Sequence, residues 1–104
     1  MFSFIETKLF TKLVQKYLSD DEYWELQSLL MKQPQAGKVI PGTGGVRKLR
    51  WRMPGKGKRG GYRILYYVKI EQGIIWMLTL YPKNVKENLP AHVLRDICKE
   101  IENE

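Results

Sequence analysis

The stretch that decides the fold is residues 62–81, which read YRILYYVKIEQGIIWMLTLY. It contains two runs rich in β-branched, aliphatic and aromatic residues, 62–69 and 74–81, and the segment Glu71-Gln72-Gly73 between them is typical of a turn. The sequence therefore predicts a β-hairpin. If the turn is centred on Gln72, Arg63 lies directly opposite Tyr81, with their Cβ atoms about 5 Å apart.

This register also assigns the two faces of the hairpin, because side chains alternate along a strand. Arg63 and Tyr81 share one face, and Lys83 leaves the second strand on the same side. A slip of one residue would turn the apolar set outward, so the register is constrained. The apolar set expected in the core is Tyr62, Ile64, Tyr66, Val68, Trp76, Leu78 and Leu80.

A third strand is predicted over residues 47–52, where basic and apolar residues alternate. Leu49 and Trp51 form an apolar side, and the opposite side is wholly cationic. If the cationic side faces the same way as Arg63, separate strands contribute to one concave surface. The residues expected on that surface are Lys48, Arg50, Arg63, Tyr81 and Lys83.

Helical periodicity precedes and follows these strands. Apolar residues recur at helical spacing over residues 9–18, and residues 19–22 form a capping-box pattern that starts a second helix. Pro34 and Gly37 end that helix, and we expect the two helices to form an antiparallel hairpin. Pro90 lies in the first turn of a last helix.

With a short strand over residues 2–6, the expected order is β-α-α-β-β-β-α, a small α+β domain with an antiparallel sheet. The chain has 104 residues, which suits one domain with one core. No apolar run approaches the ~18–20 residues of a membrane span, and the N-terminus lacks the basic and apolar regions of a signal peptide. We expect a cytoplasmic protein with no membrane partner.

The charge is concentrated in the middle of the chain. The formal net charge is +7, yet residues 26–70 contain no Asp or Glu and eleven Lys or Arg. Such clustering is unfavourable for the free protein and favours a polyanionic partner, nucleic acid above all. A solubilising loop is the alternative, and an anionic lipid surface would need an amphipathic basic helix. The cations expected to contact RNA around the site are Arg47, Arg52, Lys56, Lys58 and Arg59.

Several kinds of chemistry are excluded by what the chain lacks. A single cysteine, Cys98, and a single histidine, His92, exclude an internal disulfide, a multi-cysteine zinc site and a histidine acid–base pair. The acids at residues 20–22 fit a helix cap better than a metal site. Residues 55–60 match G-x-G-x-x-G, but they precede a strand and open no helix, which favours a basic phosphate-gripping loop. We expect neither a metal nor a cofactor.

The remaining side chains, Lys, Arg and Tyr, could only bind DNA, but they could cleave RNA, because RNA carries its own nucleophile in the 2′-OH. Lys48 could act as the base if neighbouring cations lower its pKa. Arg63 could clamp phosphate oxygens bidentately. Tyr81 could stack on a base or serve ordinary sheet packing, and both interpretations stay open.

Three segments resemble signatures of the RelE/HigB-type toxins of bacterial toxin–antitoxin systems. They are GTGGVRKLR at residues 42–50, GKRGGYRILYY at 57–67 and LTLYPKNVKENL at 78–89, and the resemblance extends over almost the whole chain. It implies a microbial RNase fold and ribosome-dependent cleavage of mRNA by attack of the 2′-OH on the adjacent phosphate without a metal ion. It also implies a cognate antitoxin, usually a helix-turn-helix protein.

By position, the resemblance assigns the two basic strand residues of the family to Lys48 and Arg50. It assigns the phosphate-clamping arginine to Arg63 and the basic residue after the last strand to Lys83. Some members have a base-stacking tyrosine where this chain has Leu89, and Tyr81 is the candidate for that role.

Three functions remain open at this stage. The first is a translation-dependent endoribonuclease. The second is a non-enzymatic inhibitor of DNA gyrase like the ParE toxins, which resemble the same fold; an apolar, protruding helical hairpin would favour it. The third is a nucleic-acid-binding module without catalysis.

Overall fold

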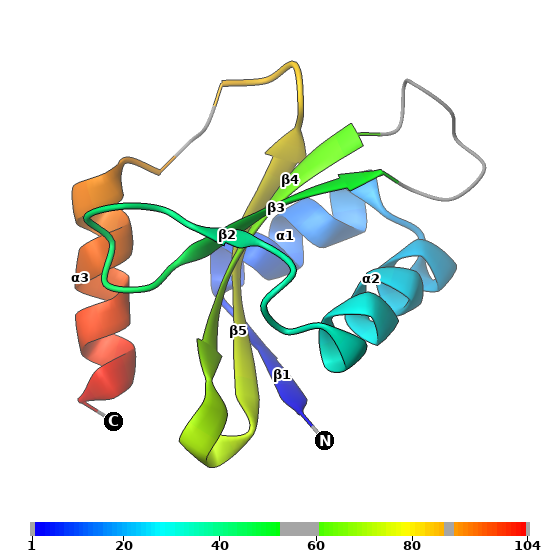
Figure 1. The fold of residues 1–104 in the computed structure, drawn as a ribbon. Helices are drawn as coiled ribbons and strands as arrows, with labels where there is room; N and C mark the ends of the chain where they lie inside the picture. The colour runs from blue at the N-terminus through cyan, green and yellow to red at the C-terminus, as the bar shows by residue number, and fades with distance from the viewer. Residues whose placement is uncertain (1, 53–60, 87–88, 104) are drawn as a thin grey trace.

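The computed structural model describes residues 2–52, 61–86 and 89–103. These residues form three α-helices and one five-stranded sheet, so the predicted α+β class is confirmed (Figure 1). A 3-10 turn, η2 (Ile70–Gln72), joins the two longest strands. In chain order the elements are β1 (Ser3–Glu6), α1 (Lys8–Tyr17), α2 (Asp20–Lys32), β2 (Lys38–Val39), β3 (Arg47–Arg52), β4 (Gly61–Lys69), β5 (Ile74–Pro82) and α3 (Ala91–Glu102).

The strands are arranged in the order β1-β5-β4-β3-β2. β1 is parallel to β5, and the other neighbouring pairs are antiparallel. The sequence did not predict β2, because a strand of two residues is too short to show an alternating pattern. Its presence extends the sheet beyond the cationic strand β3.

The register of the central hairpin is confirmed at the end that bears the cations, where Arg63 lies opposite Tyr81. Between Leu65 and Tyr66 the register shifts, so that Leu65 pairs with Thr79 but Tyr66 pairs with Met77. Leu78 is therefore an extra residue in β5, and such a bulge exchanges the faces of the residues beyond it.

The bulge makes the predicted faces wrong at Trp76 and Leu78. Both pack with Leu65 on the far side of the sheet, whereas Ile75 and Met77 join Tyr66 in the main core. The sequence allows either arrangement because both faces of β5 are apolar.

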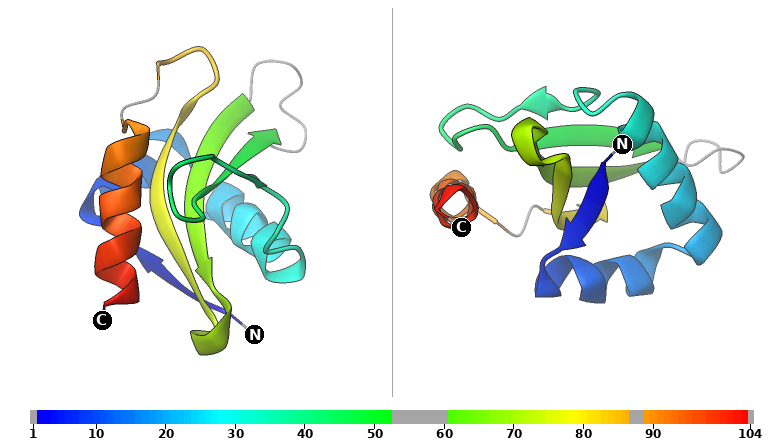
Figure 2. Two further views of the ribbon diagram at one scale, coloured as in Figure 1. Left: turned by 60° about the vertical axis from the view of Figure 1, so that its left-hand side comes forward. Right: turned by 90° about the horizontal axis from the view of Figure 1, so that it is seen from below.

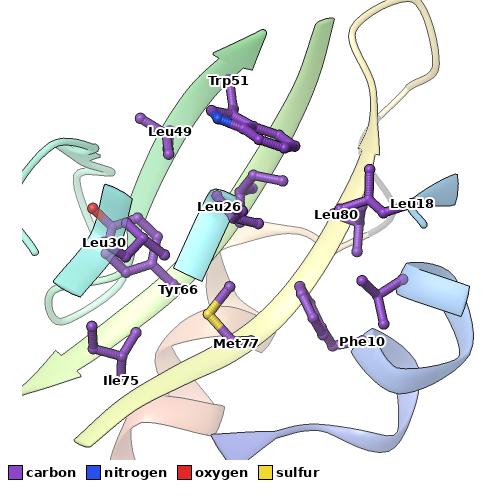
Figure 3. Close-up of a cluster of buried hydrophobic side chains, with 12 residues drawn as sticks. Phe10, Leu18, Leu26, Leu30, Leu49, Trp51, Tyr66, Ile75, Met77 and Leu80 are labelled. Carbon is purple, nitrogen blue, oxygen red and sulfur yellow. The ribbon is translucent and has the colours of Figure 1, made fainter. Parts of the chain in front are cut away.

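The main core lies between the sheet and the first two helices (Figure 3). Phe10 of α1 and Leu26 and Leu30 of α2 have no exposed surface, and they pack against Tyr66, Met77 and other residues of the sheet. Burial of each of these side chains contributes about 1.5–3 kcal/mol to folding.

Side-chain caps fix where the two helices begin. The Thr7 hydroxyl accepts a hydrogen bond from the Phe10 amide at 3.0 Å, and Ser19 forms the predicted capping box with Glu22. The chain turns at Leu18 and Ser19. As a result, the axis of α2 is inclined to that of α1, and the two helices do not lie side by side along their length (Figure 2). Both helices can thereby keep an apolar side on the same face of the sheet.

A second core lies on the other face of the sheet, beneath α3 (Figure 2). Leu94, Cys98 and Ile101 of α3 pack there with residues of β4 and β5. The buried Lys69 donates a hydrogen bond from Nζ to the Ile101 carbonyl at 2.9 Å, near the C-terminal end of α3. The Tyr67 hydroxyl donates to Glu102 Oε2 at 2.5 Å. These contacts hold the C-terminal end of α3 against the end of β4 that leads into η2. Within the described part of the chain, no helix has the length and apolar character that a membrane span requires.

Candidate functional site

The cations predicted for the catalytic site, Lys48, Arg50, Arg63 and Lys83, lie on the face of the sheet that also bears the second core. Arg50 lies opposite Arg63, and Arg63 lies opposite Tyr81. Directly opposite residues in antiparallel strands share a face, with Cβ atoms about 4.5–5.5 Å apart. Three residues from three strands therefore form one row across the sheet.

A second row lies beside the first. Lys38 is opposite Lys48, and Lys48 is opposite Leu65, so both lysines project from the face that carries Arg50 and Arg63. The sequence-based prediction included Lys48 but not Lys38, because Lys38 reaches this face only through the short strand β2.

A third row lies on the other side of the first. Arg52 is opposite Gly61, and the Lys83 amide donates a hydrogen bond to the Gly61 carbonyl at 3.1 Å. A Cβ atom on Gly61 would lie 3.0 Å from Cδ of Lys83, so the lysine side chain passes over the glycine. We call the six cations of the three rows the cationic face: Lys38, Lys48, Arg50, Arg52, Arg63 and Lys83.

Most of the cationic face is accessible to solvent. Arg50 and Arg52 are exposed, and Lys48 and Arg63 are half-buried. No Asp or Glu occurs in residues 26–70, which supply β2, β3 and β4. Like charges directly opposite one another in a sheet are destabilising, so the Arg50–Arg63 pair opposes folding, and a bound anion would relieve the repulsion.

Arg47 points to the other side of β3, together with Leu49 and Trp51. Its Nη1 donates a hydrogen bond to the Gly37 carbonyl at 2.7 Å. The Tyr66 hydroxyl accepts from the Gly37 amide at 2.8 Å and donates to the Pro34 carbonyl at 2.9 Å, and burial raises the pKa of Tyr66. Arg47 thus holds the segment between α2 and β2 and lies apart from the cationic face.

The remaining predicted site residues are Tyr81, Arg52 and three cations of the segment before β4, and they have different outcomes. Tyr81 is only 6% exposed and packs in the second core, so little of its ring can reach a ligand. Arg52 lies on the cationic face. The predicted contacts Lys56, Lys58 and Arg59 lie outside the described residues. Among the described residues, no group of three His, Cys, Asp or Glu side chains is placed to hold a metal ion.

No protein-family model matches the sequence. A solved structure of a mutant of the Escherichia coli toxin RelE in the free state is similar over 96% of this chain and 97% of that chain, with a TM-score of 0.59 and 16% sequence identity. The RelE–RelB complex of the archaeon Pyrococcus horikoshii is similar over 82% of this chain and 98% of that chain, with a TM-score of 0.52 and 24% identity. The chain has the RelE-type toxin fold. In this RelE-type fold, the cationic face lies on the same side of the sheet as α3.

Proposed function

We propose that the protein is the toxin of a type II toxin–antitoxin system and that it cleaves mRNA on the ribosome. The observation that carries the proposal is the cationic face, where cations from β2, β3, β4 and the end of β5 gather in three adjacent rows. The RelE-type fold supports the toxin assignment. The phosphate backbone of a nucleic acid is a ligand that such a surface suits, and RNA is the one we propose.

The proposed reaction is an intramolecular transesterification of the RNA, in which the phosphate moves from the 5′-oxygen to the neighbouring 2′-oxygen. The 2′-oxygen attacks the adjacent phosphorus as its proton passes to a base, and the bond from phosphorus to the 5′-oxygen breaks as that oxygen takes a proton. The products are a 2′,3′-cyclic phosphate and a 5′-hydroxyl. Arg50 and Arg63 would stabilise the extra negative charge on the pentacoordinate phosphate. This role for the cations needs no metal ion.

Lys48 and Lys83 are our candidates for the two proton-transfer roles. They lie in the rows on opposite sides of the Arg50–Arg63 row. In-line displacement places the attacking and leaving oxygens on opposite sides of the phosphorus. We propose that Lys48 serves the 2′-oxygen and that Lys83 serves the 5′-oxygen.

The partners follow from the same proposal. The protein from Pyrococcus horikoshii is a RelE–RelB complex, and we propose that a cognate antitoxin, of helix-turn-helix type, neutralises this chain as well. The ribosome and its mRNA are the proposed targets, and the cytoplasm is the proposed location.

One observation favours the alternative of a gyrase inhibitor. The helix α2 exposes Trp24 (65% exposed) and Met31 (39% exposed), which are unusual side chains to leave in water and are typical of a protein-binding surface. That surface lies on the helical side of the molecule, whereas the cationic face lies across the sheet. The ribonuclease proposal accounts for the cationic face, and the inhibitor alternative does not.

Expression of the protein in bacterial cells separates the two functions. The ribonuclease proposal predicts growth arrest, loss of translated messages and cuts at codon boundaries, all relieved by Arg63→Ala. Arg95→Ala, which removes an exposed arginine of α3, is the matched control and should still arrest growth. DNA breaks with intact messages would replace the proposal with gyrase inhibition. RNA binding without any cleavage would leave only the binding function.

A further inference from the structure

The outer face of α2 exposes large apolar side chains. Leu26 and Leu30 have no exposed surface and form the inner face of the helix, whereas Trp24 leaves 65% and Met31 leaves 39% of its surface exposed. Positions 24, 28 and 31 lie on one side of a helix, because they are separated by four and three residues. Ser28, which is half-buried, occupies the middle position. A small side chain therefore lies between two large apolar ones.

The same face carries opposite charges at its two ends. Asp21 and Glu25 are exposed near the N-terminal end of α2, and Lys32 is the exposed last residue of the helix. At 3.6 residues per turn, these three side chains point within about 40° of one another, on one flank of the line from Trp24 to Met31. An antiparallel copy of the helix would bring the basic end of one beside the acidic end of the other.

A two-fold axis through the middle of α2 makes this face complementary to itself. In an antiparallel pair with the axis between Gln27 and Ser28, Trp24 of one copy lies opposite Met31 of the other. Sulfur contacts with an aromatic ring are favourable. The small Ser28 near the axis suits the usual distance of about 8–10 Å between packed helices.

The charges match in the same arrangement. A two-fold rotation of this kind leaves each flank of the helix on its own side of the pair. Lys32 of one copy therefore lies between Asp21 and Glu25 of the other, and by symmetry the contact occurs twice. The acid-rich N-terminal ends of the two helices are about 20 Å apart, because the helices are antiparallel. That separation exceeds the screening length of about 8–10 Å in physiological salt.

We propose that the protein forms a weak homodimer in which α2 packs antiparallel against α2 of a second copy, with Trp24 against Met31 and Lys32 between Asp21 and Glu25. The charge of the chain favours this surface for self-association. Two molecules of formal charge +7 repel each other, and the repulsion is smallest where α2 holds four acidic residues and one basic residue.

The dimer does not depend on the proposed function. The helix α2 packs on one face of the sheet and the cationic face lies on the other, so the cations of both copies stay accessible (Figure 2). A single pair of helices buries less than the ~1,200–2,000 Å² of a standard interface, so we expect a dissociation constant of about 10–100 µM.

Sedimentation equilibrium of the purified full chain tests the proposal. The protein should be mostly monomeric at about 1 µM and mostly dimeric at about 1 mM. Trp24→Ser should raise the dissociation constant by at least about a hundredfold, because a central tryptophan is typical of the residues that dominate an interface. Circular dichroism checks that the variant is folded. A monomer at every concentration, or a dimer that Trp24→Ser leaves unchanged, would overturn the proposal and leave this face to a different protein.

Charge reversal tests the antiparallel register. Glu25→Lys and Lys32→Glu should each raise the dissociation constant by about tenfold, because attraction becomes repulsion at two symmetric places. Lys32→Glu also lowers the net charge, so its effect cannot come from overall repulsion. Lys12→Glu makes the same change of charge at an exposed lysine of α1 and is the control, which should not weaken the dimer.

The double variant Glu25→Lys/Lys32→Glu restores opposite charges across the two-fold axis. It should recover most of the affinity that either single variant loses. A double variant that dimerises no better than the single variants would overturn the antiparallel pairing of α2.

Discussion

At the scale of single residues, Arg63 is the centre of the account. It lies between Arg50 and Tyr81 in the middle row, with a row containing a lysine on each side. Its position opposite another arginine weakens the sheet, because like charges in directly opposite positions repel. A residue that opposes folding and faces an accessible cationic surface is more easily explained by a ligand than by packing.

Replacement of Arg63 should therefore separate activity from stability. In Arg63→Ala we expect cleavage to fall by about 10²–10³-fold, the typical cost of losing one group that stabilises the transition state. The free energy of unfolding should stay the same or rise by up to about 1 kcal/mol, since the repulsion with Arg50 is removed. Urea denaturation at low salt measures the second effect. A loss of stability that matches the loss of activity would contradict this assignment.

Most residues of the cationic face could be predicted from the sequence because they lie in strands long enough to alternate. Lys48, Arg50 and Arg63 belong to such strands, and the register placed Arg63 opposite Tyr81 correctly. Lys38 was not predicted, because β2 has only two residues and so shows no alternating pattern in the sequence. The burial of Tyr81 could not be predicted either. Its face of the hairpin also carries Arg63 and Lys69 and therefore looked exposed in the sequence, whereas in the structure Tyr81 packs in the second core with residues of α3.

At the scale of elements, the end of β5 is placed so that Lys83 crosses Gly61. Gly61→Val should displace Lys83, since a Cβ atom would lie 3.0 Å from Cδ of the lysine. We expect cleavage to fall by about ten- to a hundredfold, because a catalytic group that is misplaced by about 1 Å loses much of its effect, while the thermal unfolding temperature changes little. The backbone of Gly61 has no positive φ that would oppose a side chain. Activity in this variant equal to wild type would show that the position of Lys83 is unimportant.

The helix α3 depends on the hydrogen bond from the buried Lys69 to the Ile101 carbonyl. In Lys69→Ala we expect the free energy of unfolding to fall by about 2 kcal/mol, because hydrogen bonds from charged groups contribute ~1.5–3 kcal/mol. Hydrogen exchange should be faster in the amides of α3 than in those of α1. Lys99→Ala, which removes an exposed lysine from the same helix, is the control. It should change the free energy of unfolding by no more than about 0.5 kcal/mol and should leave the exchange of the α3 amides as in wild type. Uniformly unchanged exchange in Lys69→Ala would mean that the bond does not anchor α3.

The helices and the hairpin were the most predictable elements. The capping box at Ser19 and the turn at residues 71–73 have strong local signals, and both are present. The bulge at Leu78 has none, because Trp76, Met77 and Leu78 are all apolar and either face of β5 can accept them. Tertiary packing against α3 and the first two helices, rather than local pattern, decides which side each residue takes.

At the scale of the whole molecule, the two cores make stability sensitive to high pH. Burial, with Glu102 nearby, raises the pKa of the Cys98 thiol to about 11, whereas an unfolded thiol ionises near about 8.5. The neutral thiol is favoured in the folded state. Its contribution to stability is therefore complete below about pH 8.5 and is lost as the pH rises towards 11.

Comparison with Cys98→Ala isolates this effect, because the tyrosines titrate in both proteins. Under reducing conditions, the stability advantage of wild type over Cys98→Ala should shrink by about 3 kcal/mol between about pH 8 and about pH 11. Urea denaturation at each pH gives the two free energies of unfolding. An advantage that stays constant with pH would contradict the burial of the thiol in the second core.

The two faces of the sheet carry out different tasks. One face packs against α1 and α2, and the other packs against α3 and also carries the cations. Concentration of positive charge in residues 26–70 was visible in the sequence, but its gathering on one face depended on how β2, β3 and β4 pair.

Toeprinting of a translated message with purified ribosomes tests the central claim most directly, because it maps cuts on the RNA without cellular side effects. Wild-type protein and the Arg95→Ala control should cut the message at codon boundaries. Arg63→Ala and Lys83→Ala should leave it intact although both proteins are folded. Normal cutting by both of those variants would contradict the claim that the cationic face is the site of RNA cleavage.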